Sequence, residues 1–401
     1  MGFYRSHSVL QRKSPKHIKF WLIYVLSIVF NFHGLLVAYS NSTFMERFVS
    51  PEAIGALYTI SSCIAVFAFL FISRILRKIG NVKLTLALAF FEMLTLIVLG
   101  FTASPATAIV AFVVFMILNP LLYLNIDIFS EKLIGSDEES TGSKRGLTLM
   151  LMSIAALCAP LALGIIVGDN DDNLSKAYLV AAGVALLFMT IIITQFHSFK
   201  DPEYSEIKVL SALRSFWVRT DIRNVFFSHF TLQVFFSWTV IYFPLYLATE
   251  IGFTWDIIGY IIATGLFAYV LFEFPIGIIA DKYIGEKEMM AVGFVILAVS
   301  SSWITFMADA PVVSWMILMF ISRVGASLVE ATTESYFFKH TDGGDANIIS
   351  FFRLSRPLAM IVGALMGSVT LLYLPFELIF VALGFAMIPG IFFTMKLKDT
   401  K

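Results

Sequence analysis

The stretch Pro275–Lys287 reads PIGIIADKYIGEK. It closes one long apolar run, residues 256–280, and leads into another, residues 288–308. A helix of about 20 mostly apolar residues is long enough to cross a bilayer. A short charged turn between two such runs therefore predicts two membrane-spanning helices that run antiparallel.

The residue types in this turn suit a tight connection between helix ends. Gly277 and Gly285 allow a sharp turn and a close approach of two backbones. Asp281 can accept hydrogen bonds from the N-terminus of a neighbouring helix, where a carboxylate is favoured. Lys282 and Lys287 can pair with acidic side chains at other helix ends. The alternative interpretation of these residues is a plain positively charged turn.

The composition places the chain in lipid. Hydrophobic residues make up 59% of the 401 residues and charged residues 14%, whereas soluble domains hold about 45–50% and about 25%. The net charge is zero and no basic domain stands apart, so we expect no nucleic-acid partner. Cys63 and Cys158 show neither disulfide nor metal spacing, and we expect no cofactor. The chain has no nucleotide-binding or Ser-His-Asp pattern, so we do not expect an enzyme.

The apolar runs predict an all-α integral membrane protein with twelve transmembrane helices. Several connections between the runs are very short, which makes neighbouring helices antiparallel. The predicted spans are approximately 19–40, 52–73, 82–102, 105–128, 146–168, 175–196, 222–248, 256–280, 288–308, 311–334, 347–370 and 374–395.

The lysines and arginines predict the orientation in the membrane. With the N-terminus inside, 25 of the 28 lie on cytoplasmic segments. Arg47 and Lys176 lie on the other side, and Arg323 lies inside a span. This asymmetry follows the positive-inside rule. We therefore expect a multi-pass protein of the plasma or inner membrane with both termini in the cytoplasm.

The polar connection 197–221 divides the chain into two halves, residues 1–196 and residues 222–401. The connection is the longest between spans, and its apolar residues recur at helical spacing. They predict a short helix on the inner membrane surface, either a plain linker or a docking site for a partner: Ile207, Leu210, Leu213, Phe216 and Trp217.

The two halves repeat the same landmarks, which predicts a duplicated six-helix unit. The spacing from acid to lysine is the same in both halves, and the spacing from acid to arginine differs by one residue. The landmarks are Asp127, Lys132, Arg145 and Pro160 in the first half, and Glu334, Lys339, Arg353 and Pro357 in the second.

The turn at 277–287 resembles the cytoplasmic loop signature of the major facilitator superfamily, and the duplication is similar to the arrangement of its halves. The resemblance implies two pseudo-symmetric six-helix bundles with a small-molecule site between them. It also implies a secondary transporter that works by alternating access, with a cytoplasmic gate. The candidate gate residues are Arg77, Gly80, Asp127, Arg145, Gly277, Asp281, Lys282, Gly285, Lys287, Glu334 and Arg353.

The corresponding turn of the first half, Ser73–Lys83, departs from the signature. It keeps Arg77, Gly80 and Lys83, but Leu76 stands where the acid is expected. The lock of that half is therefore either incomplete or formed with another residue.

Polar residues within the spans are candidates for cargo binding or coupling, because each costs about 2.5–3.5 kcal/mol at mid-depth. In the family, spans one, four, seven and ten line the cavity. Arg323 is expected to pair with Glu273, either as a structural pair or in transport. His33 is expected to relay protons or to pack through hydrogen bonds, and Glu92 to be a protonated packing residue. The candidate cavity residues are Asn31, His33, Asn119, Asn125, Gln233, Trp238, Glu273, Arg323 and Glu330.

The direction and energy source of transport have weaker signals. Residues 146–164 are similar to the antiporter motif of proton-driven exporters, with alanine at several glycine positions. This resemblance favours export, and embedded carboxylates favour coupling to protons. The alternatives are a proton-coupled importer of a sugar or other metabolite, and a non-transporting receptor or scaffold. We expect a monomer whose partners are a small-molecule substrate, protons and the bilayer.

Overall fold

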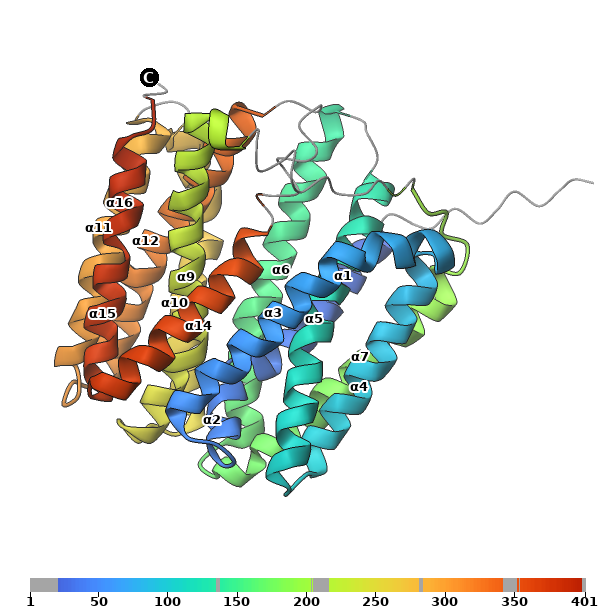
Figure 1. Cartoon of the computed structure of the whole chain (residues 1–401), viewed down its shortest axis with the longest axis horizontal. Coiled ribbons are helices and arrows are strands. Elements are labelled where there is room, and N and C mark those ends of the chain that lie inside the picture. Colours follow the sequence, from blue (N-terminus) through green and yellow to red (C-terminus); the bar gives the residue numbers. More distant parts are fainter. Residues whose placement is uncertain are drawn as a thin grey trace, which may run out of the picture.

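The computed structural model describes residues 21–134, 138–202, 204, 216–280, 284–341, 352 and 354–398, with the backbone alone at 131, 134, 138–150, 273–274 and 277–278. The described chain is helical, and Figure 1 shows the helices as one bundle. The first half holds α1 (Trp21–Ala38), α2 (Asn41–Glu46), α3 (Pro51–Ile79), α4 (Asn81–Phe101), α5 (Pro105–Ile134), α6 (Glu138–Val167) and α7 (Leu174–Gln195). The second half holds α9 (Thr220–Thr249), α10 (Trp255–Ile279), α11 (Glu286–Trp303), α12 (Val312–Lys339), α14 (Ser355–Tyr373), α15 (Ile379–Ala386) and α16 (Ile388–Met395).

The predicted spans correspond to these helices. Eleven stretches are long and apolar enough to cross a membrane, and the apolar part of α6, Leu151–Val167, accounts for the twelfth. The last span differs from the single helix predicted at 374–395, because it is split into α15 and α16 at Met387. Pro389 is the physical reason, since it has no N–H to donate back to the preceding turn.

The two halves have the same internal packing, and this confirms the two-bundle arrangement. In the first half α1 packs on α6 and α7, α4 packs on α5 and α7, and α3 packs on α5. The equivalent pairs recur in the second half, where α9 packs on α14 and α16, α11 on α12 and α15, and α10 on α12. Each half is therefore a six-helix unit of one design.

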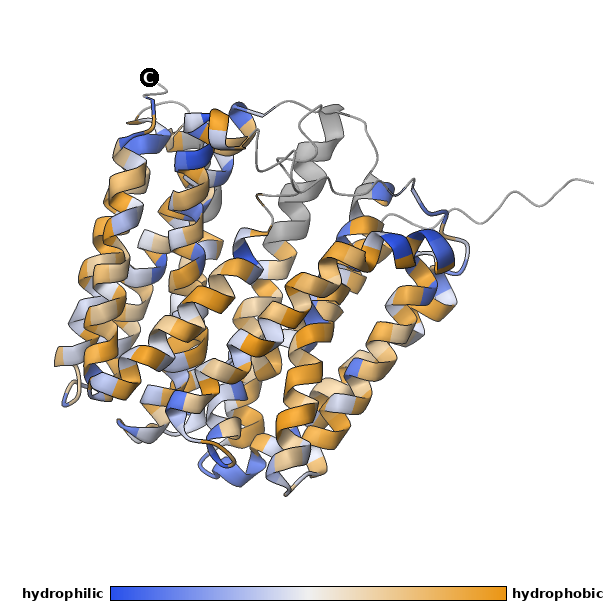
Figure 2. Ribbon diagram, in the orientation of Figure 1, coloured by the Kyte–Doolittle hydropathy of each residue, from blue (hydrophilic) through white to orange (hydrophobic). Residues whose placement is uncertain are grey.

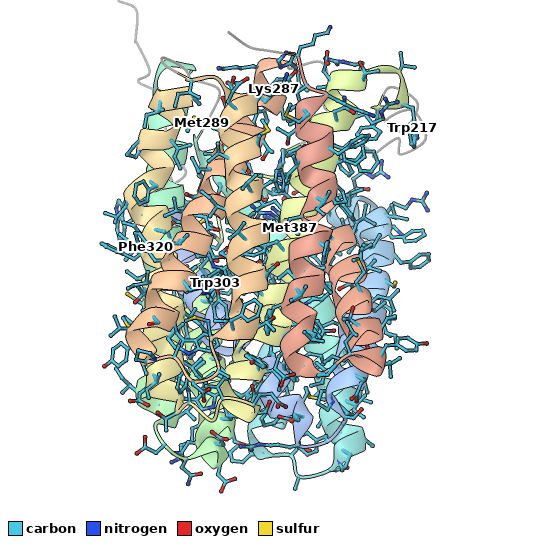
Figure 3. All side chains as sticks on the ribbon, turned by 90° about the vertical axis from the view of Figure 1, so that its left-hand side faces the viewer. Trp217, Lys287, Met289, Trp303, Phe320 and Met387 are labelled. Atoms are coloured by element: carbon cyan, nitrogen blue, oxygen red, sulfur yellow. The ribbon has the colours of Figure 1, made fainter. Side chains whose placement is uncertain are left out.

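The outer surface of the bundle is apolar, as lipid contact requires. Figure 2 shows hydrophobic residues along the helices and hydrophilic residues gathered at the two ends of the bundle. Figure 3 shows Trp303 and Phe320 on the outward face of the second half. Trp303 is exposed although it is large and apolar, which costs little when the surrounding solvent is lipid.

The halves touch closely at one end of the bundle, which we call the α2 end. There α3 packs on α14 and α10 packs on α6. A Cβ on Gly55 would lie 2.5 Å from the carbonyl oxygen of Ala364, and one on Gly259 would lie 2.5 Å from that of Pro160. Only glycine lets the helix backbones approach so closely. The hydroxyl of Ser368 on α14 also donates to a backbone carbonyl at the start of α3.

At the other end, which we call the linker end, equivalent glycine turns join α3 to α4 and α10 to α11. Gly80 has a φ of 79° and Gly285 a φ of 94°, a backbone region that glycine adopts readily. The Asn81 N–H at the start of α4 donates to the Asp201 carboxylate at 2.8 Å. Asp201, from the segment after α7, thus supplies the acid that Leu76 does not.

Tyr204 fixes the Asp201 carboxylate in place. Its hydroxyl donates to Asp201 at 2.5 Å, and its ring packs near Ile72, Leu76 and Leu84. Burial and the neighbouring Asp201 carboxylate raise the pKa of the Tyr204 phenol. The start of the segment between the halves is therefore anchored to the linker end of the first half.

Replacing Asp201 with alanine should weaken this turn. Asp201→Ala leaves the first amide of α4 without its carboxylate acceptor, and we expect the free energy of unfolding to fall by about 1 kcal/mol. Asp172→Ala is the matched control, because Asp172 is 91% exposed. Denaturant unfolding of the purified protein measures both. Equal stability of Asp201→Ala and wild type would show that the carboxylate does not support the turn.

Candidate functional site

A cavity of about 440 Å³ lies between the two halves, formed by α3, α5 and α14. On α3 the close contacts of the α2 end are at Gly55 and Thr59, and the cavity begins at Ser62, further toward the linker end. The two halves are therefore closed at the α2 end and separated by the cavity on its linker side. Its walls are formed by Ser62, Ala65, Phe69, Met116, Asn119, Pro120, Tyr123, Leu124, Asp127, Arg356, Pro357 and Met360.

Two prolines lie in the cavity wall. Pro120 is inside α5, where it has no N–H to donate to the carbonyl of Met116. Pro357 lies in the first turn of α14, where the missing N–H costs least. Pro357 places Arg356, its neighbour, at the start of α14 and on the same wall.

Arg356 is the cation of the cavity wall among the described residues. Its Nη2 donates to the Glu330 carboxylate of α12 at 3.4 Å, and its side chain is 61% exposed. A guanidinium has five N–H donors, so this single long contact leaves donors directed at the cavity. The carboxylates of Glu330, Glu334 and Asp127 all act electrostatically on Arg356. The predicted cavity residue Glu330 therefore contacts this guanidinium, and the predicted gate residues Glu334 and Asp127 act on it through their charge.

A second polar group lies behind the α5 wall, buried within the first half. The His33 Nε2 atom is 3.0 Å from the Glu92 carboxylate, and both side chains are almost fully buried. The Asn119 amide donates to the other Glu92 oxygen at 2.8 Å. Asn31, on α1, accepts from the hydroxyl of Tyr123. Two predicted cavity residues, His33 and Asn119, thus contact Glu92, and a third, Asn31, contacts Tyr123 of α5.

Three other predicted cavity residues lie in the packed interior. The Asn125 side chain is buried, and its backbone carbonyl accepts from Asn81 at 2.9 Å. Gln233 contacts His229 at 3.2 Å, and His229 contacts Thr333 at 3.2 Å. Trp238 is fully buried in the largest apolar cluster. The structure does not bring these three to the cavity wall.

Arg323 is buried between α9, α10 and α12. Its Nη2 donates to Thr239 at 3.2 Å, and the guanidinium lies 5.1 Å from the centre of the Phe235 ring. A Cβ on Gly265 of α10 would lie 3.0 Å from Arg323 Cγ. The expected partner Glu273 lies eight residues beyond Gly265, about 12 Å along the helix. Its side chain is outside the described part, so the pair stays a prediction.

The gate residues that the structure describes lie at the linker end. Arg77 and Gly80 are at the α3–α4 turn, and Gly285 and the half-buried Lys287 are at the α10–α11 turn. Figure 3 shows Lys287 at this end of the second half. Of the remaining candidates, Asp281, Lys282 and Arg353 lie outside the described residues, and the backbone alone is described at Arg145 and Gly277.

An ion pair with a buried carboxylate lies next to the α10–α11 turn, and the candidate gate residues did not include it. Glu286, the first residue of α11, is 1% exposed and pairs with Lys339 of α12. Ser335 of α12 donates to the same carboxylate at 3.1 Å. Lys339 was one of the landmarks repeated between the halves, and its role is to hold α12 to the start of α11.

The closed α2 end carries acidic residues from both halves. Glu46 ends α2, Asp171 precedes α7, and Glu250 follows α9. Burial, together with Glu250 and Asp171, raises the pKa of the Glu46 carboxyl.

Sequence reasoning missed Arg356 and the role of Glu92 for identifiable reasons. Arg356 counted among the cytoplasmic cations, although its position directly before Pro357 in the repeated landmark was a usable signal. Glu92 lies on a helix that packs at the periphery, and only the alignment of α1 with α4 shows that it faces His33. Within the described ranges, no group of three or more His, Cys, Asp or Glu side chains could hold a metal ion.

Comparison with known proteins supports the architecture. Residues 225–401 match the family model described as Major Facilitator Superfamily. No curated protein matches the chain in sequence.

Solved structures match over nearly the whole chain. A point mutant of the nucleoside transporter NupG is 14% identical, with a TM-score of 0.74, covering 93% of this chain and 99% of that one. A POT family transporter in complex with 5-aminolevulinic acid is also 14% identical, with a TM-score of 0.73, covering 94% of each chain. At such identities the likeness shows the fold alone.

The family match in the second half, the twelve spans and the shared fold agree with one another. These three findings point to a non-enzymatic transporter of small molecules across a membrane. The second half of the chain, residues 225–401, matches the major facilitator superfamily, and the whole chain has the fold of the solved transporters.

Proposed function

We propose that this protein is a proton-coupled secondary transporter that exports a small organic molecule by alternating access. The observation that carries the proposal is the cavity between two six-helix units that are closed at the α2 end. A site reached from one side only is what alternating access requires of each end state. The proposed halves are residues 1–196 and 222–401, joined by 197–221, and the proposed unit is a monomer.

The two close interfaces suit a rocking motion of the halves. The pairs α3–α14 and α6–α10 are equivalent under the internal duplication. When they separate at the α2 end, the linker ends of the same helices can approach. The gate residues Arg77, Glu334 and Lys287 would then approach residues of the other half. With the linker end in the cytoplasm, as the lysines and arginines predict, the present cavity faces inward.

The cavity supports a proposal for the class of cargo. Its volume of about 440 Å³ falls in the range of sites for small organic ligands, about 300–1,000 Å³. Phe69 and Met116 offer apolar surface, while Asn119, Tyr123 and Arg356 offer hydrogen bonds. This wall suits a molecule with an apolar body and at least one polar or anionic group. Nucleosides and 5-aminolevulinic acid belong in the first panel to be tested, because one similar structure is named as a nucleoside transporter and another as a complex with 5-aminolevulinic acid.

Coupling to protons is supported by titratable groups close to the cavity. Glu330 contacts Arg356 in the cavity wall. His33 lies behind the wall residue Asn119, with the Glu92 side chain between the two. The chain has no nucleotide-binding pattern, so the energy would come from a gradient. A proton that binds near the cargo site can shift the balance between two conformations by its differential affinity for them.

Export is favoured by the small-residue face of α6. A Cβ on Gly164 would lie 2.9 Å from Cα of Asp256 on α10. Together with the contact between Pro160 and Gly259, this makes the close packing that the antiporter-like residues 146–164 predict. Counterflow of labelled cargo distinguishes export from import.

Cargo should bind to Arg356. In a thermal-shift screen of the purified protein, a ligand at 100 times its Kd stabilises the folded state by about 2.7 kcal/mol. We expect Arg356→Gln to abolish the shift and Arg223→Gln to retain it, because Arg223 contacts Trp217 away from the cavity. A ligand that stabilises Arg356→Gln as well as wild type would place the cargo elsewhere. No ligand at all would favour the receptor or scaffold alternative.

A larger residue at Gly55 should open the α2 end. In Gly55→Val the side chain meets the Ala364 carbonyl, and overpacking of this kind costs about 1–3 kcal/mol. We expect lower stability and faster thiol labelling of a cysteine at Ser368, with Cys63 and Cys158 replaced by alanine. Gly183→Val is the control, since a Cβ there meets nothing within 4 Å. If Gly55→Val matches Gly183→Val in both measurements, the α2 end is not held closed by this contact.

A further inference from the structure

Three side chains, two of them buried and one in the cavity wall, form a chain from the interior of the first half to the cavity. They are His33 on α1, Glu92 on α4 and Asn119 on α5. His33 is 0% and Glu92 1% exposed. Asn119 lines the cavity and also donates to Glu92. The proposed function uses none of the chemistry of Glu92.

Both nitrogens of the His33 ring face acceptors. Nδ1 is 2.5 Å from the carbonyl oxygen of Phe30, and Nε2 is 3.0 Å from the carboxylate of Glu92. A carbonyl oxygen accepts and cannot donate, so Nδ1 must carry a proton. Nε2 and the facing Glu92 oxygen can then be in contact only if one of them is also protonated.

The geometry therefore fixes the number of protons in the pair. A neutral imidazole with an ionised carboxylate has one N–H proton and a net charge of −1. The contacts require two protons, which gives an imidazolium with a carboxylate or a neutral imidazole with a carboxylic acid. Both forms are neutral overall. Neutrality is what a buried pair favours, because an uncompensated charge in a low-dielectric interior is costly.

The surroundings offer little compensation for a lost proton. Phe30 and Phe188 pack around the His33 ring, from α1 and α7. On α5 the Glu92 charge acts on the titratable group of Tyr123, whose hydroxyl donates to Asn31. In the described part of these helices, the pair therefore faces aromatic rings and neutral hydrogen-bonding groups.

Losing the proton would force a movement that reaches the cavity. Deprotonation leaves two acceptors facing each other at 3.0 Å, and they must separate. Glu92 is also held by the Asn119 amide, whose nitrogen would lie 3.2 Å from a Cβ on Gly34. Gly34 gives this amide its space beside α1. A shift of Glu92 therefore displaces a side chain in the cavity wall.

We propose that the His33–Glu92 pair is a proton-binding site that Asn119 links to the cavity. The proton on Nε2 or on the Glu92 oxygen leaves to water in the cavity, and the pair remains as a neutral imidazole and a carboxylate. That the bound proton drives cargo movement rests on the proposed function. The binding of the proton itself does not.

Infrared difference spectra of the purified full-length protein in lipid test this site without any cargo. Spectra are recorded over a series of pH values, in water and in heavy water. We expect a pH-dependent component from the carboxyl or the imidazole that is lost in Glu92→Gln and in His33→Gln. The same component should persist in Glu330→Gln, which removes a carboxyl in contact with Arg356 instead.

Glu92→Gln is suited to this test because it preserves the contacts. Its amide N–H can donate to the bare Nε2 of a neutral His33, and its carbonyl can accept from Asn119. We therefore expect it to fold, as gel filtration and circular dichroism will show. A component that survives in Glu92→Gln, or that is lost in Glu330→Gln instead, would overturn the proposal.

Transport assays separate this proposal from the proposed function. Once a cargo is known, Glu92→Gln should retain exchange of labelled for unlabelled cargo but lose accumulation driven by a pH gradient. Accumulation equal to that of wild type would show that the site does not couple. If the infrared component is present but no compound is transported, the proton site stands and the proposed function fails.

Discussion

The close approach of helix backbones at the α2 end is the constraint on which the rest of the arrangement depends. Gly55 and Gly259 lie against carbonyl oxygens of the opposite half, which leaves no room for a Cβ on either glycine. Straight helices that touch at one end and are tilted apart must leave space at the other. The cavity of about 440 Å³ is that space, and its position on the linker side follows from the position of the contacts.

Within lipid, every charge near this cavity has a partner that limits its cost. The two halves contribute in different ways. The second half supplies a guanidinium, Arg356, held by a single contact with Glu330 and open to the cavity. The first half supplies a sealed pair, His33 with Glu92, connected to the cavity through Asn119. Accessible charge suits recognition of a cargo, and buried charge suits a response to a proton.

The fold could be predicted from the sequence because span length and the lysine–arginine asymmetry are local properties. The glycine turns at Gly80 and Gly285 were also visible, since a turn between apolar runs needs few distant contacts. The break in the last span was missed, although Pro389 marks it. The span was predicted from the length of the apolar run alone, and that criterion does not take account of a proline inside the run.

The candidate site was predicted only in part, because it depends on which residues of neighbouring helices lie at the same depth along the bundle. Asn31, His33 and Asn119 lie together as membrane-embedded polar residues should. Gln233 was expected at the cavity but contacts His229 inside its own half, since a polar residue can meet its partner on the same helix. Asp201 caps α4 from 120 residues away, and no local pattern could reveal that contact.

Alternating access requires the two halves to rock about the site between them. Spin-label distances across the halves test it most directly, with one pair at the linker end, Lys78 and Phe338, and one at the α2 end, Phe101 and Tyr373. Changing from inward-facing conditions to a pH gradient with bound cargo should shorten the first distance and lengthen the second. Two distances that stay constant, or that change in the same direction, would contradict alternating access in this protein.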